Sequence, residues 1–308
     1  MKTIDILCIG EVLIDCIGHE LNASIQLTQN YHRYLGGSPT NLAQYAASLG
    51  LRVQLVASCG QDGLGDFIVN ELQDRKIPTQ HVRRTPEPTS IILVSRSTQT
   101  PDFIAYRNAD CSILPSQIDN ETIANARLFH TTCFALSKNP AQSTILEKAK
   151  LANELGLQLS IDLNYSEKIW PDKAEAQAVI AEYLSYNPLV KISVDDCFRY
   201  FGESKSEEFI FDYFHGLGAE LICYTKGSEG VVVSDKTNGL YSQAAQPIAE
   251  IKDATGAGDA FWTGFLYGQL QQYSLESCVT LAQKLAVLKL QTLGALPAQL
   301  HLNEHLTV

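Results

Sequence analysis

A nearly continuous apolar run, Ile4–Ile9, opens the chain and restricts its possible folds more than any other stretch. Such a run indicates a strand covered on both faces, as in a parallel sheet, because a half-exposed strand would alternate apolar and polar residues. Similar short apolar segments recur between stretches with helical spacing, at 53–57, 128–132, 157–161, 189–194 and 221–225. Strands that alternate with helices predict an α/β fold with a Rossmann-like, mostly parallel sheet and helices on both faces.

Two stretches, approximately 12–38 and 88–108, depart from this alternation. Within the second, Ser90–Ser95 and Phe103–Arg107 are β-rich segments separated by polar residues, which predicts a hairpin. We therefore expect a small β-sheet lid beside the main sheet. Because the sequence has no repeat, low-complexity run or linker, we expect a single domain over 1–308. The lid sheet also offers an edge through which two copies could pair as a homodimer.

Composition narrows the function classes. The chain has 308 residues and a net charge of −11, with no dense cluster of Lys and Arg, which argues against nucleic acid and anionic membranes as partners. Its eight cysteines form no Cys-x-x-Cys pair, so we interpret them as reduced thiols. There is no signal-peptide pattern and no apolar run of membrane-spanning length. We expect a cytoplasmic protein.

The stretch Asp253-Ala-Thr-Gly-Ala-Gly-Asp259 carries the strongest chemical signal. Its glycines permit a tight turn into a helix, and the unpaired N–H groups of a helix start bind phosphate well. Asp259, in the first turn, could accept a proton from a hydroxyl that attacks a bound phosphate. The alternative is an acidic residue that merely stabilises the helix start. The small residues Ala260, Gly264 and Gly268 share one face of this helix, which indicates close packing against a backbone or a ligand.

A second glycine-rich stretch, Gly36-Gly-Ser-Pro-Thr-Asn41, also opens a helix. Here Ser38 is expected as the N-cap and Pro39 at the first helical position. A third stretch, Thr225-Lys-Gly-Ser-Glu-Gly230, reads as a turn between two strands.

Together these three stretches, with Gly10-Glu-Val-Leu-Ile-Asp15 ahead of them, resemble the ribokinase/PfkB family of sugar kinases, most closely bacterial fructokinases. The resemblance covers essentially the whole chain. It implies ATP-dependent transfer of a γ-phosphate to a terminal sugar hydroxyl, with Mg²⁺ as a cofactor. A potassium ion is a further implied cofactor, and the sequence leaves open whether this chain uses it.

The resemblance also implies roles for individual residues. Asp259 would be the general base, and the N–H groups of Gly256, Ala257 and Gly258 would hold the transferring phosphoryl group. Positions that match sugar-contacting residues of the family are Asp15, Gly36, Gly37, Asn41, Arg107, Asp162 and Asn164. For Arg107 a solvated surface position is the alternative, and for Asp15 and Asn41 it is a strand end or a helix start.

For the nucleotide, the resemblance implies that ATP binds at Lys191, Thr225, Gly227 and Gly230, together with Gly256 and Gly258. Asp196 would order water molecules around Mg²⁺, although Ser193 and Asp196 replace the Asn and Glu that relatives usually carry. Asp253, Thr255 and Gly294 match a monovalent-cation loop. The stretch Asp162-Leu-Asn-Tyr-Ser166 lacks the proline and arginine of the common family pattern, so no arginine is available there for an acidic substrate.

Fructose, converted to fructose 6-phosphate, is the expected substrate, and 2-keto-3-deoxygluconate and 5-dehydro-2-deoxygluconate are the alternatives. A non-catalytic sugar sensor with a kinase fold is an alternative of a different class. A nicotinamide-dependent oxidoreductase and a P-loop kinase are disfavoured because neither glycine motif of those classes occurs.

Overall fold

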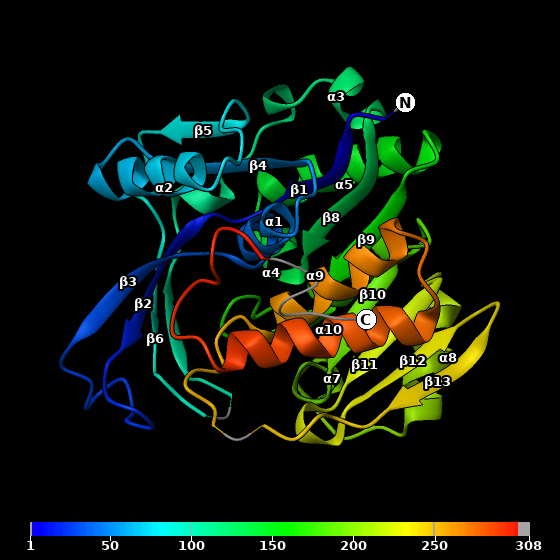
Figure 1. Ribbon diagram of the computed structural model, residues 1–308. Helices are drawn as coiled ribbons and strands as arrows, with labels where there is room; N and C mark the ends of the chain where they lie inside the picture. The colour runs from blue at the N-terminus through cyan, green and yellow to red at the C-terminus, as the bar shows by residue number, and fades with distance from the viewer. Residues whose placement is uncertain (1, 99, 249, 301–308) are drawn as a thin grey trace.

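The computed structural model describes residues 2–98, 100–248 and 250–300. Over these residues the main sheet has nine strands in the order β13-β12-β11-β10-β9-β8-β1-β4-β5 (Figure 1). The strands of this sheet are β1 (Ile4–Ile9), β4 (Val53–Gly60), β5 (Val82–Thr85), β8 (Ala126–Thr132), β9 (Gln158–Asp162), β10 (Leu189–Ser193), β11 (Leu221–Thr225), β12 (Val231–Asp235) and β13 (Gly239–Gln243). Neighbours run parallel from β5 to β11, and β12 and β13 add an antiparallel hairpin. The predicted mostly parallel sheet is confirmed.

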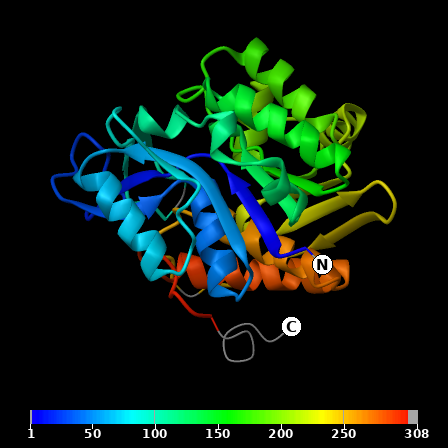
Figure 2. The same ribbon diagram turned by 90° about the horizontal axis from the view of Figure 1, so that it is seen from above.

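Helices cover both faces of this sheet, as Figure 2 shows from above. One face carries α1 (Ser38–Ser48), α2 (Gly63–Asp74), α9 (Ala257–Leu270) and α10 (Leu275–Leu290). The other carries α3 (Asn120–Ala124), α4 (Cys133–Leu136), α5 (Ala141–Glu154), α6 (Lys173–Leu184), α7 (Val194–Phe201) and α8 (Glu207–Leu217). Successive residues of β1 belong to opposite cores: Ile6 and Cys8 to the first, Leu7 and Ile9 to the second. Its unbroken apolar run is therefore explained by burial on both sides.

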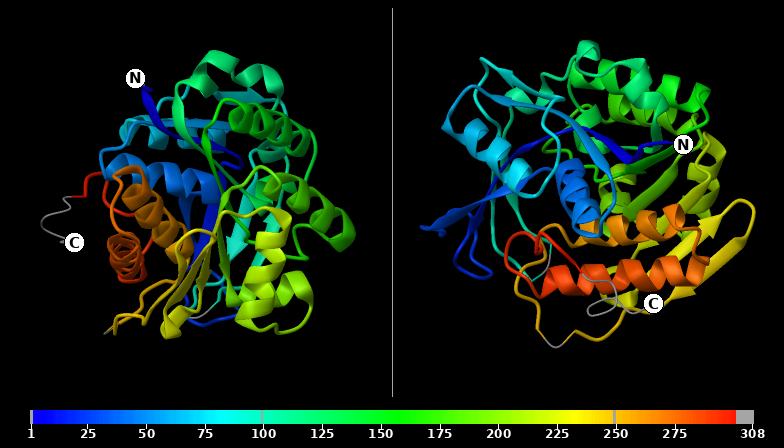
Figure 3. Two further views of the ribbon diagram at one scale, coloured as in Figure 1. Left: turned by 90° about the vertical axis from the view of Figure 1, so that its right-hand side faces the viewer. Right: turned by 45° about the horizontal axis from the view of Figure 1, so that its top comes forward.

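A separate four-stranded sheet has the order β3-β2-β6-β7. It is built from β2 (Leu13–Gly18), β3 (Tyr31–Gly36), β6 (Ile91–Val94) and β7 (Phe103–Tyr106), all within the two stretches that the sequence set apart. In Figure 3 these blue and cyan strands lie to one side of the main sheet. The β6–β7 hairpin is confirmed. Strand β3 lies within the predicted lid stretch 12–38, where it pairs along its whole length with β2.

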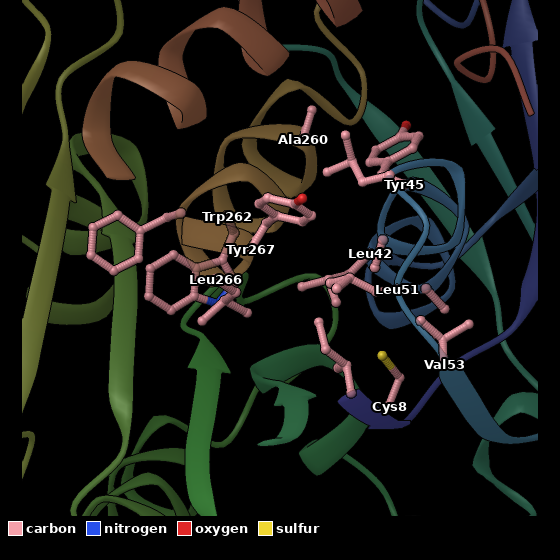
Figure 4. Packing of buried hydrophobic residues seen from close by; sticks show 14 of the residues in the cluster. Cys8, Leu42, Tyr45, Leu51, Val53, Ala260, Trp262, Leu266 and Tyr267 are labelled. Atoms are coloured by element: carbon pink, nitrogen blue, oxygen red, sulfur yellow. The ribbon is translucent and has the colours of Figure 1, made fainter. Parts of the chain in front are cut away.

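The glycine face of α9 packs directly on α10. A Cβ on Gly264 would lie 2.8 Å from Cα of Ala282, and one on Gly268 would lie 2.7 Å from Sγ of Cys278. The predicted close approach to a backbone is thus confirmed, and that backbone belongs to helix α10. On the side facing α1, Leu266 joins Leu42 in one continuous apolar layer (Figure 4). This packing fixes the start of α9 in space.

All eight cysteines are free thiols, and all but Cys16 are buried, as their apolar surroundings in the sequence suggested. Among the helices of the described residues, none combines the length and the apolar character needed to cross a bilayer.

Candidate active site

The site forms at the edge of the main sheet where its parallel strands end. Such carboxyl edges are where open α/β sheets bind ligands, because the loops that follow the strands converge there. Asp162 ends β9, Ser193 ends β10 and Thr225 ends β11, and the last two are register neighbours. The start of α9 lies at the same edge, since Lys191 of β10 contacts it.

The start of α9 has the features of an anion-binding site. Gly256 is its N-cap in the left-handed conformation (φ 77°), and no side chain caps the helix. Nζ of Lys191 lies 2.8 Å from the place a Cβ on Gly258 would occupy, so a cation stands beside the helix start. The Ala257 amide donates to the carbonyl of Ala254 at 3.2 Å within the loop. Helix dipole, glycine amides and lysine together favour a phosphate here.

Asp259 is held by two donors from the first turn of α1. Oγ of Ser38 donates to its Oδ1 at 2.6 Å, and Nδ2 of Asn41 donates to its Oδ2 at 2.8 Å. The structure therefore brings Asn41 and Asp259 together. Both carboxylate oxygens are oriented, which is what a base that must meet one particular hydroxyl requires.

The expectation that Ser38 caps α1 is wrong. The N-cap is Gly37 (φ 99°), and Ser38 is the first helical residue. The Ser38 hydroxyl donates a hydrogen bond to Oδ1 of Asp259, while the Ser38 amide donates to Oε1 of Glu11 at 3.0 Å. A distant carboxylate thus takes the place of a local cap. Sequence reasoning missed this role because the partner lies far along the chain.

Glycines allow the residues that are expected to contact the substrate to approach one another closely. A Cβ on Gly36 would lie 2.2 Å from Oδ2 of Asp15, and one on Gly37 would lie 2.4 Å from the carbonyl oxygen of Glu11. Burial, with the negative charges of Asp259 and Asp253, raises the pKa of Asp15 to about 7. Asp15, Gly36 and Gly37 therefore lie together, with Asp15 within electrostatic reach of Asp259.

Glu11 is a buried carboxyl that sequence reasoning noted only as part of a motif. Its Oε2 accepts from Oγ1 of Thr132 at 3.0 Å, and its carbonyl accepts from Oγ1 of Thr40 at 2.8 Å. Burial raises the pKa of Glu11 to about 8. It joins the end of β1 to the start of α1, and so positions Ser38.

Asp162 and Lys191 form a buried ion pair. The two distances from Nζ of Lys191 to the Asp162 carboxylate oxygens are 3.0 and 2.9 Å. Burial acts to lower the pKa of Lys191, but the carboxylates of Asp162, Asp196 and Asp259 outweigh it, and the pKa is raised. Lys191 is therefore a charged lysine at the start of α9, and Asp162 holds it there.

Arg107 and Asn164 make contacts within the protein. Arg107 donates to Asp110 at 2.9 and 2.6 Å, also bonds Ser137, and lies over the ring of Phe134 at 4.1 Å. Its side chain is only 8% exposed, so the alternative of a solvated arginine is wrong. Oδ1 of Asn164 accepts from the Phe134 amide at 3.1 Å. Both residues brace the segment around α4.

The segment expected to bind the nucleotide contains two glycines, Gly227 and Gly230, which differ in what surrounds them. A Cβ on Gly230 (φ 104°) would lie 2.1 Å from the carbonyl oxygen of Gln243, so packing against β13 explains this glycine. Gly227 (φ 55°) faces open space. It therefore leaves room for a ligand beside the end of β11, where Thr225 lies.

Both carboxylate oxygens of Asp196 accept hydrogen bonds from neighbouring residues. Its Oδ2 accepts from Oγ of Ser193 at 2.5 Å in a capping box at the start of α7, and its Oδ1 accepts from Arg199 at 2.9 Å. In the part of the chain that the structure describes, no three acidic, histidine or cysteine side chains converge as metal ligands. A magnesium ion would thus be held chiefly by the triphosphate and water, as is usual for Mg²⁺ with nucleotides.

The loop expected to hold a monovalent cation contains a lysine. Asp253 accepts from the Thr255 amide at 3.1 Å, and Nζ of Lys289 lies 3.6 Å from its Oδ2. Gly294 (φ 76°) packs against Tyr34, whose Cε1 would lie 2.2 Å from an added Cβ. Burial lowers the pKa of Lys289, and the nearby carboxylates oppose this effect. Sequence reasoning missed Lys289, although a single lysine within the apolar run 285–290 was a signal.

The site combines the carboxyl edge of an open α/β sheet, an uncapped helix start suited to phosphate and an oriented carboxylate. This combination is typical of phosphotransferases. Residues 3–300 match the pfkB family carbohydrate kinases. The chain belongs to the PfkB family and is an ATP-dependent carbohydrate kinase.

Three similar proteins illustrate the range of activities among its relatives. The chain is 33% identical to the ATP-dependent 6-phosphofructokinase of Thermoanaerobacterium thermosaccharolyticum over 296 residues, which cover 96% of this chain and 90% of the relative. It is 26% identical to the 5-dehydro-2-deoxygluconokinase of Geobacillus kaustophilus, over 89% of this chain and 84% of the relative. The solved fructokinase of Halothermothrix orenii superposes with a TM-score of 0.79 at 32% identity, over 91% and 96% of the two chains.

Proposed function

We propose that this protein transfers the γ-phosphate of ATP to the terminal hydroxyl of fructose and forms fructose 6-phosphate. The observation that carries the proposal is the Asp259 carboxylate, which Ser38 and Asn41 orient at the uncapped start of α9. An oriented base next to an anion-binding helix start is the arrangement that phosphoryl transfer to an alcohol needs.

The reaction divides between the two sides of Asp259. On the sugar side, Asp15 accepts hydrogen bonds from ring hydroxyls, and Asn41 donates hydrogen bonds to them. Asp259 takes the proton from the terminal hydroxyl while that oxygen attacks the γ-phosphorus atom, and ADP leaves. On the phosphate side, Lys191 and the amides of Gly256 and Gly258 stabilise the charge that spreads over the transferring group. Bound Mg²⁺ would neutralise charge on the β- and γ-phosphates, with Asp196 ordering its water molecules.

Three cations near the site are already paired with carboxylates, which favours a neutral sugar as the substrate. Arg107 is paired with Asp110, Lys191 with Asp162 and Lys289 with Asp253. Binding an acidic sugar through one of these three cations would require its pair to break, and breaking a buried pair is strongly disfavoured. The pairing of these cations favours fructose over the acidic sugars 2-keto-3-deoxygluconate and 5-dehydro-2-deoxygluconate.

Fructose 6-phosphate is the second candidate substrate. The identity of 33% with a 6-phosphofructokinase favours it. A cavity of about 240 Å³, lined among others by His19, His32 and Arg96, lies at the small sheet beside Tyr34. Its arginine and histidines are groups that bind phosphate well. This cavity would receive the phosphate that the sugar already carries.

ADP release by the purified protein, measured with each sugar in turn, tests the proposal. The panel contains fructose, fructose 6-phosphate, 2-keto-3-deoxygluconate and 5-dehydro-2-deoxygluconate. We expect the highest kcat/KM with fructose. A higher value with fructose 6-phosphate would select the second candidate, and a higher value with either acid would contradict the charge argument. Sugar binding without ADP release would instead indicate a sensor.

Dimerisation through the small sheet remains a prediction. Its edge strand β7 exposes Ile104 (42%) and Tyr106 (55%), and an unpaired edge with apolar side chains favours pairing between copies. Sedimentation of the wild type and of a variant with Tyr106→Lys would test it. A monomeric wild type would contradict it.

A further inference from the structure

The last turn of α10 directs a buried lysine at the loop before α9. The side chain of Lys289 is 3% exposed, and its Nζ lies 3.6 Å from Oδ2 of Asp253. Nζ also donates to the carbonyl of Thr292 at 3.3 Å. Cε of Lys289 lies 3.5 Å from the place a Cβ on Gly256 would occupy. The ammonium group therefore lies next to the left-handed N-cap of α9.

Asp253 requires a positive charge at this place. It is fully buried, and its Oδ1 already accepts from the Thr255 amide. Within the described residues its Oδ2 has no hydrogen-bond partner. A buried carboxylate without a counter-charge is strongly disfavoured, and Lys289 provides that counter-charge.

The residues present do not fit a monovalent cation beside this lysine. Asp253 is the one carboxylate of the expected cation loop, whose other members are Thr255 and Gly294, and the ammonium group already neutralises it. A second positive charge in the same buried place would be repelled by the first. The Thr255 hydroxyl, which lacks a hydrogen-bond partner in the described part of the chain, is neutral and does not offset that repulsion.

We infer that Lys289 replaces the monovalent cation in this chain and that turnover is independent of potassium. Lys289 is a positioning residue: its charge holds Asp253, and through it the loop that leads into Gly256 and the phosphate-binding amides. The inference rests on the role proposed above for that loop.

The first test compares turnover of the wild type in potassium chloride and in tetramethylammonium chloride at equal ionic strength, because tetramethylammonium is too large for such a loop. We expect kcat values that agree within about twofold. A loss of about tenfold or more without potassium would overturn the inference.

The second test uses Lys289→Met, with Lys148→Met as the matched control. Lys148 is also buried, but it lies on α5 and pairs with the exposed Glu147 at 3.0 Å. We expect Lys289→Met to lose turnover in tetramethylammonium and to regain it when potassium is added, because the ion then takes the vacated place. The control should respond to neither salt. A Lys289→Met variant that melts like the wild type yet stays inactive in potassium would show that potassium cannot replace the ammonium group, and would overturn the inference.

The third test needs no turnover and separates this inference from the proposed substrate. Crystals of both proteins are soaked in rubidium chloride, and rubidium is located by its anomalous scattering. We expect rubidium between Asp253 and Thr255 in Lys289→Met and none there in the wild type. Rubidium at that place in the wild type would overturn the inference, whichever sugar the enzyme phosphorylates.

Discussion

Asn41 and Asp259 are 218 positions apart in the chain, yet Nδ2 of the first lies 2.8 Å from Oδ2 of the second. The contact joins the start of α1 to the start of α9, whose helices pack in one apolar core. Ser38 makes a parallel contact to the other carboxylate oxygen. The carboxylate that we propose as the base therefore has a fixed direction before any sugar binds.

Loss of one of these donors should slow the chemical step. In Ser38→Ala, Asp259 keeps Asn41 but loses a charged hydrogen bond, and we expect kcat to fall roughly tenfold with a smaller change in KM. Ser48→Ala is the control, because Ser48 is a buried serine of the same helix whose hydroxyl donates to the carbonyl of Tyr45, away from Asp259. Equal kcat values for both variants would show that Ser38 does not orient the base.

Stability of the sugar-free enzyme should fall as pH rises from about 5 to 8. Asp15 and Glu11 have folded pKa values of about 7 and about 8, above those of the unfolded chain. The folded state therefore keeps protons that the unfolded state has released, so the free energy of unfolding falls as pH rises from the unfolded pKa to the folded pKa of each carboxyl. For Asp15 the loss is on the order of 2 kcal/mol.

Urea unfolding at several pH values measures this slope. Asp15→Asn should flatten it in part and leave the contribution of Glu11. Asp74→Asn, at an exposed carboxylate at the end of α2, should leave the slope unchanged. A wild type whose free energy of unfolding rises over this range would contradict the assignment.

The contact between α9 and α10 should not tolerate a methyl group. In Gly264→Ala the new Cβ would meet backbone of Ala282 at 2.8 Å, so the helices must separate, and we expect a loss of about 1–3 kcal/mol. Gly216→Ala is the matched control: it lies in α8 with nothing within 4 Å of an added Cβ, and should stabilise by up to about 1 kcal/mol. If both variants gain stability, the tight contact does not exist.

The layered fold was predictable because local patterns determine it. The unbroken run of β1 and the helical spacing that follows each strand predict a parallel sheet without knowledge of any distant contact. The start of α9 was predictable for the same reason, since its glycines act locally. The lid sheet was predicted as a stretch, but the bounds of β3 and its pairing with β2 were not, because its own polar residues do not indicate a strand.

Contacts between distant segments were not predictable. Local rules assign Ser38 to a cap, and only the folded chain brings it to Asp259. Arg107 suggested a ligand contact or an exposed position, but Asp110 and Ser137 surround it. Lys289 looked like one more helical residue until the fold placed it against Asp253. The chemistry of a site depends on such pairs, so a sequence alone indicates the residue types and not their partners.

The proposed phosphoryl transfer depends most on Asp259 as the base, and one substitution tests that role directly. Asp259→Asn keeps the size of the side chain and removes its ability to accept the proton. We predict that kcat falls by roughly 10²- to 10⁴-fold while the melting temperature and the sugar Kd stay close to those of the wild type. A folded Asp259→Asn enzyme that turns over at nearly the wild-type rate would contradict the account.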